Sequence, residues 1–335
     1  IRDRSSSCPQ LKGGGVMDAK LLIRNGGLYY EPAVEGAVSL DLERRGAPGK
    51  LTFTAIDDSA LKVEEGNRVQ LTIDGTEVFS GFLFSRQYDQ DGQVKMTAYD
   101  QLRYLKNKDI YNYENLTATQ VVEMIADDYM LQKGVLEDTR WVIGNRVEDN
   151  RSLFDIILSA LDLTLQNTGR LFVLYDECGK LTLRDIENMK LDLLVDAQTA
   201  SSYDYTASID SDTYNQISLV YDNQDAGRRE VTGVRDAGNI ERWGVLQYFE
   251  KVQKDENAGA KAAALLQLYN RTARSLTVKG ALGDVRVRGG SSVIVRLTLG
   301  DIAVSNYMVV EKVSHKFDTQ FHTMDLTLRG GVINV

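Results

Sequence analysis

The chain has 335 residues, and its 48 acidic residues outnumber its 39 lysines and arginines, which gives a net charge of −9. This acidic balance, without a basic cluster to neutralise phosphates, argues against a nucleic-acid-binding groove, and no apolar run approaches the ~18 residues that a membrane-spanning helix needs. The chain has two cysteines, Cys8 and Cys178, which are too few for a disulfide framework. So low a cysteine content is typical of proteins that assemble in a reducing compartment.

The N-terminal stretch, residues 1–16, contains Lys12-Gly13-Gly14, which a ribosome-binding sequence upstream of a start codon for Met17 can encode. We therefore expect residues 1–16 to be an unstructured translated leader and the natural protein to begin at Met17. A lipoprotein signal is the weaker interpretation, because no apolar segment precedes Cys8.

Residues 17–110 are predicted to form a first antiparallel β-barrel. Apolar and polar residues alternate with a period of two in "KLTFTAID", "NRVQLTIDGTEVFSGFLFSRQYD" and "GQVKMTAYD", which is the pattern of half-buried strands. Asn-Gly and Asp-Gly pairs supply the positive φ of tight hairpin turns, and they stand at Asn25-Gly26, Asp74-Gly75 and Asp91-Gly92.

The period changes in residues 111–189, which we predict to be a small α/β domain. The segments "NLTATQVVEMIADDYML" and "NRSLFDIILSALDLT" place apolar residues on one helical face, and the first has a cap at Thr117 or Thr119. A hairpin follows and turns at Cys178-Gly179. The predicted buried helical faces consist of Val121, Val122, Ile125, Tyr129, Leu153, Ile156, Ile157, Ala160 and Leu161.

Strands return in residues 190–335, which we predict to be a second β-barrel region. One packing helix interrupts it at 254–273, where an alanine run favours close packing on a sheet. The predicted fold class is therefore mainly β with an α/β insertion (α+β), with two related antiparallel β-barrel domains and a small helix–helix–hairpin domain.

Two segments, Gly66–Asp100 and Gly290–Gly330, resemble each other. Each predicts a strand, a Gly/Asp turn, a strand, a turn and a strand, with the apolar residues in the same phase, which indicates a duplicated barrel. The alignment matches Val69, Leu71 and Ile73 with Val293, Val295 and Leu297; Val78, Phe82 and Phe84 with Val304, Met308 and Val310; and Met96 and Ala98 with Met324 and Leu326.

The two histidines of the chain, His315 and His322, are the first candidates for chemistry. The alignment places His322 at the position of Val94, on the apolar side of a strand, and His315 near Tyr88 or Asp89. Position 322 is therefore predicted to accept a valine.

The hairpin expected around these histidines keeps them apart. With residues 318–321 as the turn, Phe317 faces His322, and His315 lies one diagonal away at roughly 7–8 Å. That separation argues against a direct pair, Asp325 points to the other face, and a catalytic or metal site would need a third partner. We interpret both histidines as strand residues.

Other candidates also have simpler structural interpretations. Asp127 and Asp128 are the most tempting carboxylate pair for a glycosidase, but neighbours on a helix diverge by about 100°, which favours a solvated helix face. Asp57-Asp58 is typical of a turn, and Cys178 at a hairpin tip predicts a plain exposed thiol.

Two glycine-containing segments remain. "GALGDVRVRGG" lacks the strand, GxGxxG and helix order of a phosphate loop. Trp243, in the loop "RDAGNIERWG", is interpreted as a packing anchor rather than a sugar platform. We therefore predict no catalytic, cofactor-binding or metal-binding residues, and a protein that is not an enzyme.

The stretches "GDVRVRGGSSVIVRLTLGD", "YMVVEKVSHKF" and "HTMDLTLRGG" resemble the baseplate hub proteins of contractile phage tails. The closest group looks like the hubs of PBSX-type prophages, within the late-control protein D superfamily. "FSGFLFS", "VKMTAYDQLRYLKNKD" and "IERWGVLQ" extend the resemblance over nearly all of residues 18–333. The resemblance implies two related β-barrels with smaller α/β parts, a homotrimer on the tail axis and no catalytic residues.

The resemblance also implies partners and a place. The partners are a tail tube protein, a central spike protein and other baseplate proteins, including a LysM-containing one. The place is the baseplate of a virion tail or tail-like particle, assembled in the bacterial host cytoplasm. Three chains with two barrels each would present six similar units, so such a trimer could adapt a sixfold tube to a threefold spike.

Two functions from other classes stay open. A tail-associated cell-wall hydrolase predicts that activity depends on Asp128 or Glu123. A carbohydrate-binding module predicts saturable glycan binding through Trp141 or Trp243. Activity assays on the corresponding variants would separate both from a purely structural hub.

Overall fold

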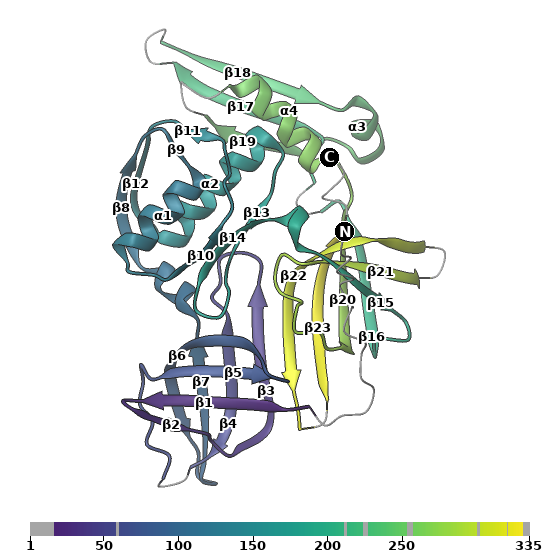
Figure 1. Ribbon diagram of the computed structural model, residues 1–335. Coiled ribbons are helices and arrows are strands. Elements are labelled where there is room, and N and C mark those ends of the chain that lie inside the picture. Colours follow the sequence, from purple (N-terminus) through teal and green to yellow (C-terminus); the bar gives the residue numbers. More distant parts are fainter. Residues whose placement is uncertain are drawn as a thin grey trace, which may run out of the picture.

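The computed structural model describes residues 17–57, 60–210, 213–223, 227–252, 257–299, 302–319 and 321–330. The expected leader at residues 1–16 lies outside the described residues. Strands predominate and a few helices interrupt them, as predicted for this fold class. Figure 1 shows two β-lobes side by side, with the helices and further short strands above them. Across these ranges, no helix has both the length and the hydropathy to span a membrane.

The first lobe is built from β1 to β7 in the order β3-β4-β7-β6-β5-β1-β2. Its neighbouring strands are antiparallel, and alternate residues point into one core that includes the fully buried Phe53, Leu71 and Met96. Positive φ angles at Gly26, 58°, and Gly75, 79°, confirm the predicted hairpin turns there. The strands are β1 (Ala19–Asn25), β2 (Leu28–Tyr30), β3 (Val34–Glu43), β4 (Lys50–Ile56), β5 (Arg68–Ile73), β6 (Thr76–Tyr88) and β7 (Gln93–Tyr99).

The second lobe has the order β16-β20-β23-β22, and β21 and β15 continue the sheet from the first half of β22. The β15–β21 pair is parallel, and the other pairs are antiparallel. Val293, Val310 and Leu326 lie in its core. The strands are β15 (Lys190–Asp196), β16 (Ser202–Ser208), β20 (Ala273–Leu282), β21 (Ser292–Leu299), β22 (Ile302–Phe317) and β23 (His322–Gly330).

Strand β22 joins the two lobes. Its first half pairs with β21, and its second half pairs with β3 of the first lobe, from Lys312 opposite Glu43 to Phe317 opposite Val38. The lobes are therefore one continuous 13-stranded sheet. The pairings of the described residues close no barrel, so the expectation of two closed barrels is not confirmed. One edge of each lobe, β3 or β22, pairs with the other lobe instead of closing within its own.

The predicted helices of the small domain are confirmed as α1 (Ala118–Asp128) and α2 (Leu153–Thr168). Thr117 is the N-cap of α1 in a reciprocal capping box with Gln120. Every predicted face residue is buried except Tyr129, which is half-buried just after α1. The other elements are η1 (Gln101–Lys106), β8 (Lys108–Tyr113), β9 (Leu116–Thr117), β10 (Lys133–Leu136), β11 (Val142–Ile143), β12 (Arg146–Ser152), β13 (Phe172–Asp176), β14 (Leu181–Asp185) and η2 (Ile186–Met189).

A further sheet lies between β16 and β20 in the chain. Its strands have the order β18-β17-β19, and α4 packs on β17, with Ala262 and Leu265 buried against Ile217. Helix α4 begins behind the Asn257 cap and lies inside the predicted helical segment 254–273. The elements are β17 (Gln216–Asn223), β18 (Arg228–Arg235), α3 (Ala237–Trp243), β19 (Gln247–Lys251) and α4 (Ala258–Tyr269).

The two similar segments have the same strand order, β5-β6-β7 and β21-β22-β23, but part of the predicted alignment is wrong. Val69 pairs with Gly81, and Val293 pairs with Met308, so the match of the first strands is confirmed. The counterpart of Met308 is therefore Gly81 and not Phe82. Such a one-residue error reverses the faces of a strand, because side chains alternate with a period of two.

The third strands are offset by two residues from the predicted alignment. Both lobes have a β-bulge at an equivalent place, between Leu83 and Ser85 and between Val310 and Lys312. Beyond the bulges, Tyr88 pairs with Val94 and His315 pairs with Met324. The counterpart of Val94 is therefore Met324, whereas His322 corresponds to a residue of the first lobe's turn. Between matched positions, each hairpin of the second lobe spans three residues more than its counterpart, whereas the predicted alignment allowed two, and a period-two pattern does not record this difference in length.

Candidate functional site

The joint between β22 and β3 is held by charge as well as by backbone pairing. Lys312 Nζ lies 3.0 Å from Glu43 Oε1, and Arg44 Nε lies 2.8 Å from Glu311 Oε2. The backbone nitrogen of Arg44 also donates to the carbonyl oxygen of Glu311 at 2.9 Å. Phe317, at the end of β22, is buried in the core of the first lobe. Backbone hydrogen bonds, two ion pairs and a buried aromatic side chain thus hold the joint together.

The histidines meet at this joint, so the prediction that they are too far apart for a direct pair is wrong. His315 Nδ1 lies 2.9 Å from His322 Nε2, and His315 Nε2 lies 2.9 Å from the carbonyl oxygen of Val287. Their backbone positions are diagonal, as predicted, since Phe317 pairs with His322 and His315 with Met324. The imidazole rings lean across the diagonal, with centroids 5.1 Å apart. The imidazole side chains are therefore long enough to meet although their backbone positions are diagonal.

The hydrogen bonds fix the protonation of this pair. A carbonyl oxygen only accepts, so His315 Nε2 carries the proton and donates to Val287, and Nδ1 accepts from His322 Nε2–H. Burial lowers the pKa of both His315 and His322 to about 4, and the proximity of His322 contributes to the shift of His315. His315 is 1% exposed. Both of its ring nitrogens are in use, which leaves no lone pair for a metal ion.

The glycine-rich segment 280–290 surrounds the histidines and contacts three parts of the chain. A Cβ at Gly283 would lie 2.1 Å from the ring of His322, and one at Gly289 would lie 2.3 Å from the backbone nitrogen of Arg44. Gly290 has a φ of 96° and lies against Val173 of the small domain. The segment leads into strand β21, not a helix, so the order of a phosphate loop is absent here.

A carboxylate pair, the buried Asp100 and the half-buried Asp176, was not recognised in the sequence. Burial and the proximity of Asp176 raise the pKa of Asp100 well above its usual value, and burial also raises the pKa of Asp176. Asp100 accepts from the backbone nitrogens of Gly49, at 2.7 Å, and Leu102, at 3.0 Å. Two aspartates so far apart in the chain give no local signal, apart from the cap that Asp100 provides for η1.

Asp176 connects this pair to the joint. Its Oδ1 accepts from the backbone nitrogen of Gly179 at 2.6 Å, and its carbonyl oxygen accepts from Arg288 Nη1 at 3.1 Å. The guanidinium of Arg288 also lies 4.3 Å from the ring centroid of Tyr175. Segment 280–290 is thereby fastened to the small domain. Asp100 is buried behind backbone groups, so a substrate cannot reach it and the pair is not an open acid/base site. The pair instead stabilises the contact between the small domain and the lobes.

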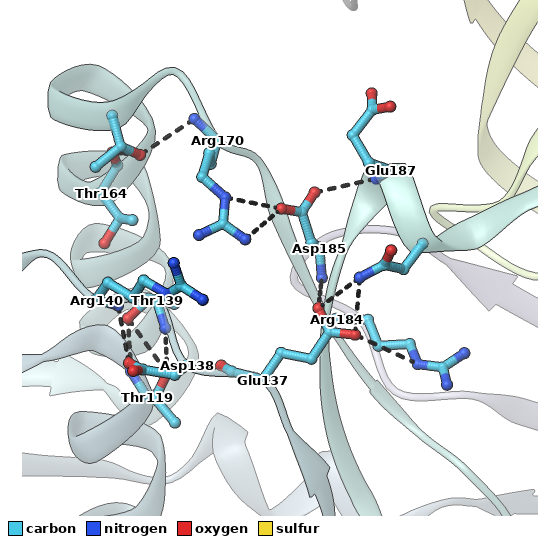
Figure 2. Close-up of polar contacts among 12 residues, drawn as sticks. Thr119, Glu137, Asp138, Thr139, Arg140, Thr164, Arg170, Arg184, Asp185 and Glu187 are labelled. Carbon is cyan, nitrogen blue, oxygen red and sulfur yellow. Dashed lines mark hydrogen bonds and ion pairs between the residues drawn. The ribbon is translucent and has the colours of Figure 1, made fainter.

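Figure 2 shows a second carboxylate network, inside the small domain. Asp185 accepts from Arg170 Nε, at 2.9 Å, and Nη2, at 2.7 Å, and its other oxygen accepts from the backbone nitrogen of Glu187 at 3.0 Å. Glu137 accepts from the backbone nitrogen of Asp185 at 2.8 Å and from Asn188 Nδ2 at 3.1 Å. Each carboxylate oxygen is already bonded, so the network braces β14 and η2.

The carboxylates proposed for a hydrolase do not converge on one another. Asp127 accepts from Lys133 Nζ at 2.6 Å, whereas Asp128 accepts from the Tyr111 hydroxyl at 2.8 Å. Glu123 is exposed on the same helix, α1. Asp57 is exposed after β4, and Asp58 lies outside the described residues. Among the residues that the structure describes, no three His, Cys, Asp or Glu side chains gather as a metal site would require.

Cys178 differs from the predicted plain exposed thiol. The predicted turn is confirmed, with φ angles of 49° at Cys178 and 84° at Gly179. The thiol is half-buried against the first lobe, where Sγ donates to the carbonyl oxygen of Glu77 at 3.2 Å. Burial raises the pKa of Cys178 to about 11. The hairpin tip packs on β6, a contact that the sequence could not reveal.

The two tryptophans lie in different places. Trp141 is half-buried on the core of the small domain. Trp243 is half-buried at the end of α3, which buries none of its residues, and the guanidinium of Arg242 lies 5.5 Å from its ring centroid. Trp243 is therefore not an anchor in a core.

A cleft of about 370 Å³ lies between the second lobe, α2 and the β17–β19 sheet. Two carboxylates line it, Asp162 and Glu311, and each is held by an arginine, Arg45 and Arg44 respectively. Side chains already engaged in ion pairs are poor candidates for a general acid or base. The cleft therefore marks where domains meet.

The YQBQ-like family matches residues 38–329 of this chain. The phage-like element PBSX protein XkdQ of Bacillus subtilis (strain 168) is 31% identical over 303 residues, which are 88% of this chain and 91% of that protein. Among solved structures, the 43 kDa tail protein of prophage MuSo2 from Shewanella oneidensis has a TM-score of 0.67 at 13% identity, covering 92% of this chain and 98% of that one. This fold is therefore that of a prophage tail protein.

The E. coli c3393 protein is similar as well, with a TM-score of 0.56 at 12% identity, over 94% of this chain and 80% of that chain. It is described as a component of the type VI secretion system with structural similarity to T4 bacteriophage tail proteins gp27 and gp5. The same fold thus occurs in a prophage tail protein and in a component of a type VI secretion system.

Proposed function

The chain belongs to the YQBQ-like family, and on that premise we propose that it is the structural baseplate hub of a contractile phage tail or tail-like particle. In this role it is a homotrimer that adapts a sixfold tail tube to a threefold central spike. Its partners are the tube protein, the spike protein and other baseplate proteins, including a LysM-containing one, and the particle assembles in the host cytoplasm.

The observation that carries the proposal is the joint between β22 and β3. It holds two lobes of the same strand order side by side in one sheet. A trimer of such chains presents six similar lobes around its axis, which can match a sixfold tube on one side. The threefold relation between whole chains then matches a spike on the other side. A single-lobed chain could not provide both symmetries in this way.

We also propose that the protein has no catalytic activity. Asp100 and His315 are buried, their partners Asp176 and His322 are half-buried, and all four side chains are bonded to backbone groups or, for His322, to the neighbouring imidazole. Such groups stabilise domain contacts and offer no open site for a substrate. A cell-wall hydrolase and a carbohydrate-binding module remain the alternative functions, to be tested at Asp128, Glu123, Trp141 and Trp243.

Counting copies in the assembled complex tests the hub proposal. The chain is co-expressed with its tube and spike partners, because a lone hub can need them to trimerise, and the complex is measured by light scattering and electron microscopy. Three copies per complex are expected. Two or four copies would contradict the proposal, since four or eight lobes cannot match a sixfold tube.

A further inference from the structure

The pairing of β22 with β3 would have its equivalent between β6 and β16, and in the described chain the edges that would form it have no partner strand. In the second lobe the strands follow the order β16-β20-β23-β22, and in the first lobe they follow the order β3-β4-β7-β6. Strand β22 therefore corresponds to β6, and β3 corresponds to β16. Within the chain, β22 pairs with β3. We propose that β6 of one copy pairs with β16 of the next copy in the same antiparallel manner.

The correspondence of β6 and β22 holds at single residues. The backbone nitrogen of Leu83 donates to Asn67 at 2.8 Å, and that of Val310 donates to Ser291 at 2.8 Å. The reverse bonds, from Gly66 to Leu83 and from Gly290 to Val310, measure 2.7 and 2.8 Å. A β-bulge follows immediately in both strands. The residues after the bulges, 85–88 and 312–315, are thus equivalent.

Both edges required by the proposal are open in the described chain. Beyond the bulge, residues 85–88 of β6 pair with β7 along one edge, whereas the equivalent part of β22 pairs with β23 and β3. Strand β16 ends the 13-stranded sheet and pairs with β20 alone. Figure 1 shows β6 and β16 on opposite sides of the two-lobed sheet, so one copy cannot pair them with each other.

The segment beside β6 does not block this edge. In the second lobe the equivalent segment carries Val287, whose carbonyl oxygen accepts from His315, and β22 still pairs with β3. Val63 is the residue of the first lobe that corresponds to Val287, and its carbonyl oxygen accepts a hydrogen bond from the guanidinium of Arg86. Because the segments occupy equivalent positions, the edge of β6 is as accessible as that of β22.

The register of the new pair follows from the existing one. Leu40 pairs with Leu51, which pairs with Ala98, and the corresponding series is Tyr205, Leu276 and Leu328. Leu40 and Tyr205 are therefore equivalent, and His315, which pairs with Leu40, is equivalent to Tyr88. The proposed register places Tyr88 opposite Tyr205, Gln87 opposite Thr206, and Ser85 opposite Ser208 of the next copy.

The side chains at the two joints differ, which makes the joints chemically distinct. Lys312 and Glu43 form an ion pair in the internal joint, and their counterparts are the neutral Ser85 and Ser208. Tyr88 is 55% exposed, and pairing would cover it with Tyr205 of the next copy. Exchanging the partners would lose one exposed ion pair, so these side chains favour the proposed pairing by a small amount.

The contact is heterologous, because β6 of each copy meets β16 of the next. Such contacts close into a ring when the rotation between copies closes, and closure pairs the β6 and β16 edges of every copy. This inference rests on the proposed function for the number of copies, three. The pairing itself follows from the repeated lobes.

Disulfide trapping tests the pairing. In a background with Cys8→Ser and Cys178→Ser, the variant carries Gln87→Cys and Thr206→Cys and is oxidised in the co-expressed complex. Opposite positions of antiparallel strands have Cα separations of about 4.5–5.5 Å, within the range of a disulfide. Linked dimers and closed trimers are expected on a denaturing gel. The positive control is Ser314→Cys with Asp41→Cys, which forms an intrachain link at the equivalent internal pair.

A second pair of variants tests the register without cysteines. Ser85→Lys with Ser208→Lys places like charges opposite each other and should weaken assembly, whereas Ser85→Lys with Ser208→Glu recreates the internal ion pair and should restore it. The negative control for trapping, Gln87→Cys with Arg229→Cys on β18, should give no links. A complex of three copies without the expected links would overturn the pairing and leave the hub proposal standing. Links in a complex of another size would overturn the hub proposal alone, and a monomer would overturn both.

Discussion

The neutral imidazoles of His315 and His322 are joined by a hydrogen bond of 2.9 Å between His315 Nδ1 and His322 Nε2. His315 Nε2–H donates a second hydrogen bond, also of 2.9 Å, to the carbonyl oxygen of Val287. This chain of bonds connects the β22–β23 hairpin to segment 280–290. Phe317 stacks on His322 with ring centroids 4.4 Å apart. The pair is a structural element of the lobe joint, and it has measurable consequences for stability.

Replacing His322 with valine should destabilise the protein, contrary to the expectation from the sequence alignment. The change leaves His315 Nδ1 buried without its donor, which costs about 1–3 kcal/mol. Urea unfolding of His322→Val measures the loss, and Thr327→Val, at an exposed position of the same strand, is the matched control. A His322→Val variant as stable as the control would show that the hydrogen bond contributes nothing.

Stability should fall as the pH falls through the range 6.5 to 4. The folded pKa of His315 is about 4, below the unfolded value of 6.5, so the unfolded state binds protons first. At pH 5 this removes about 2 kcal/mol through His315 alone. The proton linkage of Asp100 has the opposite sign, because its folded pKa is raised.

A difference measurement separates these two effects. The free energy of unfolding is measured from pH 7.5 to 4.5 for the wild type and for His315→Leu with His322→Val, in which the carboxylates are unchanged. The advantage of the wild type should shrink as the pH falls. A difference that stays constant across this range would refute the assignment of neutral, buried histidines.

Gly289→Ala should weaken the joint between the lobes. Its Cβ would lie 2.3 Å from the backbone nitrogen of Arg44, so the backbone of one lobe must move. Overpacking of this kind typically costs about 1–3 kcal/mol. Gly27→Ala is the control, since a Cβ there meets no atom within 4 Å and the backbone has no positive φ. Equal unfolding midpoints for the two variants would contradict the close approach.

Cys178 should react slowly with thiol reagents in the folded protein. Its pKa of about 11, against a model-peptide value near 9, leaves about a hundredfold less thiolate at neutral pH. The rate of modification by an aromatic disulfide is measured in a Cys8→Ser background, before and after unfolding in urea. Similar rates in both states would mean that the contact with Glu77 does not protect the thiol.

The purified protein should not hydrolyse peptidoglycan, because its clustered carboxylates are bonded to backbone or arginine groups. Turnover above buffer that disappears with Asp128→Asn or Glu123→Gln would establish the hydrolase. Glycan binding that disappears with Trp141→Ala or Trp243→Ala would establish the carbohydrate-binding module instead. Neither variant pair should alter the number of copies in the complex.

The sequence by itself determined what depends on neighbouring residues. Period-two alternation located the strands of both lobes, and Asn-Gly and Asp-Gly pairs located turns of the first lobe, because positive φ is a local requirement. The sequence predicts a cap at Thr117 or Thr119, and Thr117 is the cap of α1; the Asn257 cap of α4 emerges only from the structure. The sequence pattern did not predict short polar strands such as β8 and β12, because their residues are mostly exposed and show no regular apolar–polar alternation.

Only the tertiary structure decided what depends on distant residues. The hairpin lengths set the alignment of the two lobes, because each hairpin of the second lobe spans three residues more than its counterpart, and a hydrophobic pattern does not record that difference. The contact of His315 with His322 required side chains to lean across a diagonal, and the pair of Asp100 with Asp176 required two domains to meet. The pairing of β22 with β3 joins residues far apart in the chain, with Lys312 opposite Glu43 at a separation of 269 positions, so no local sequence pattern could select this partner.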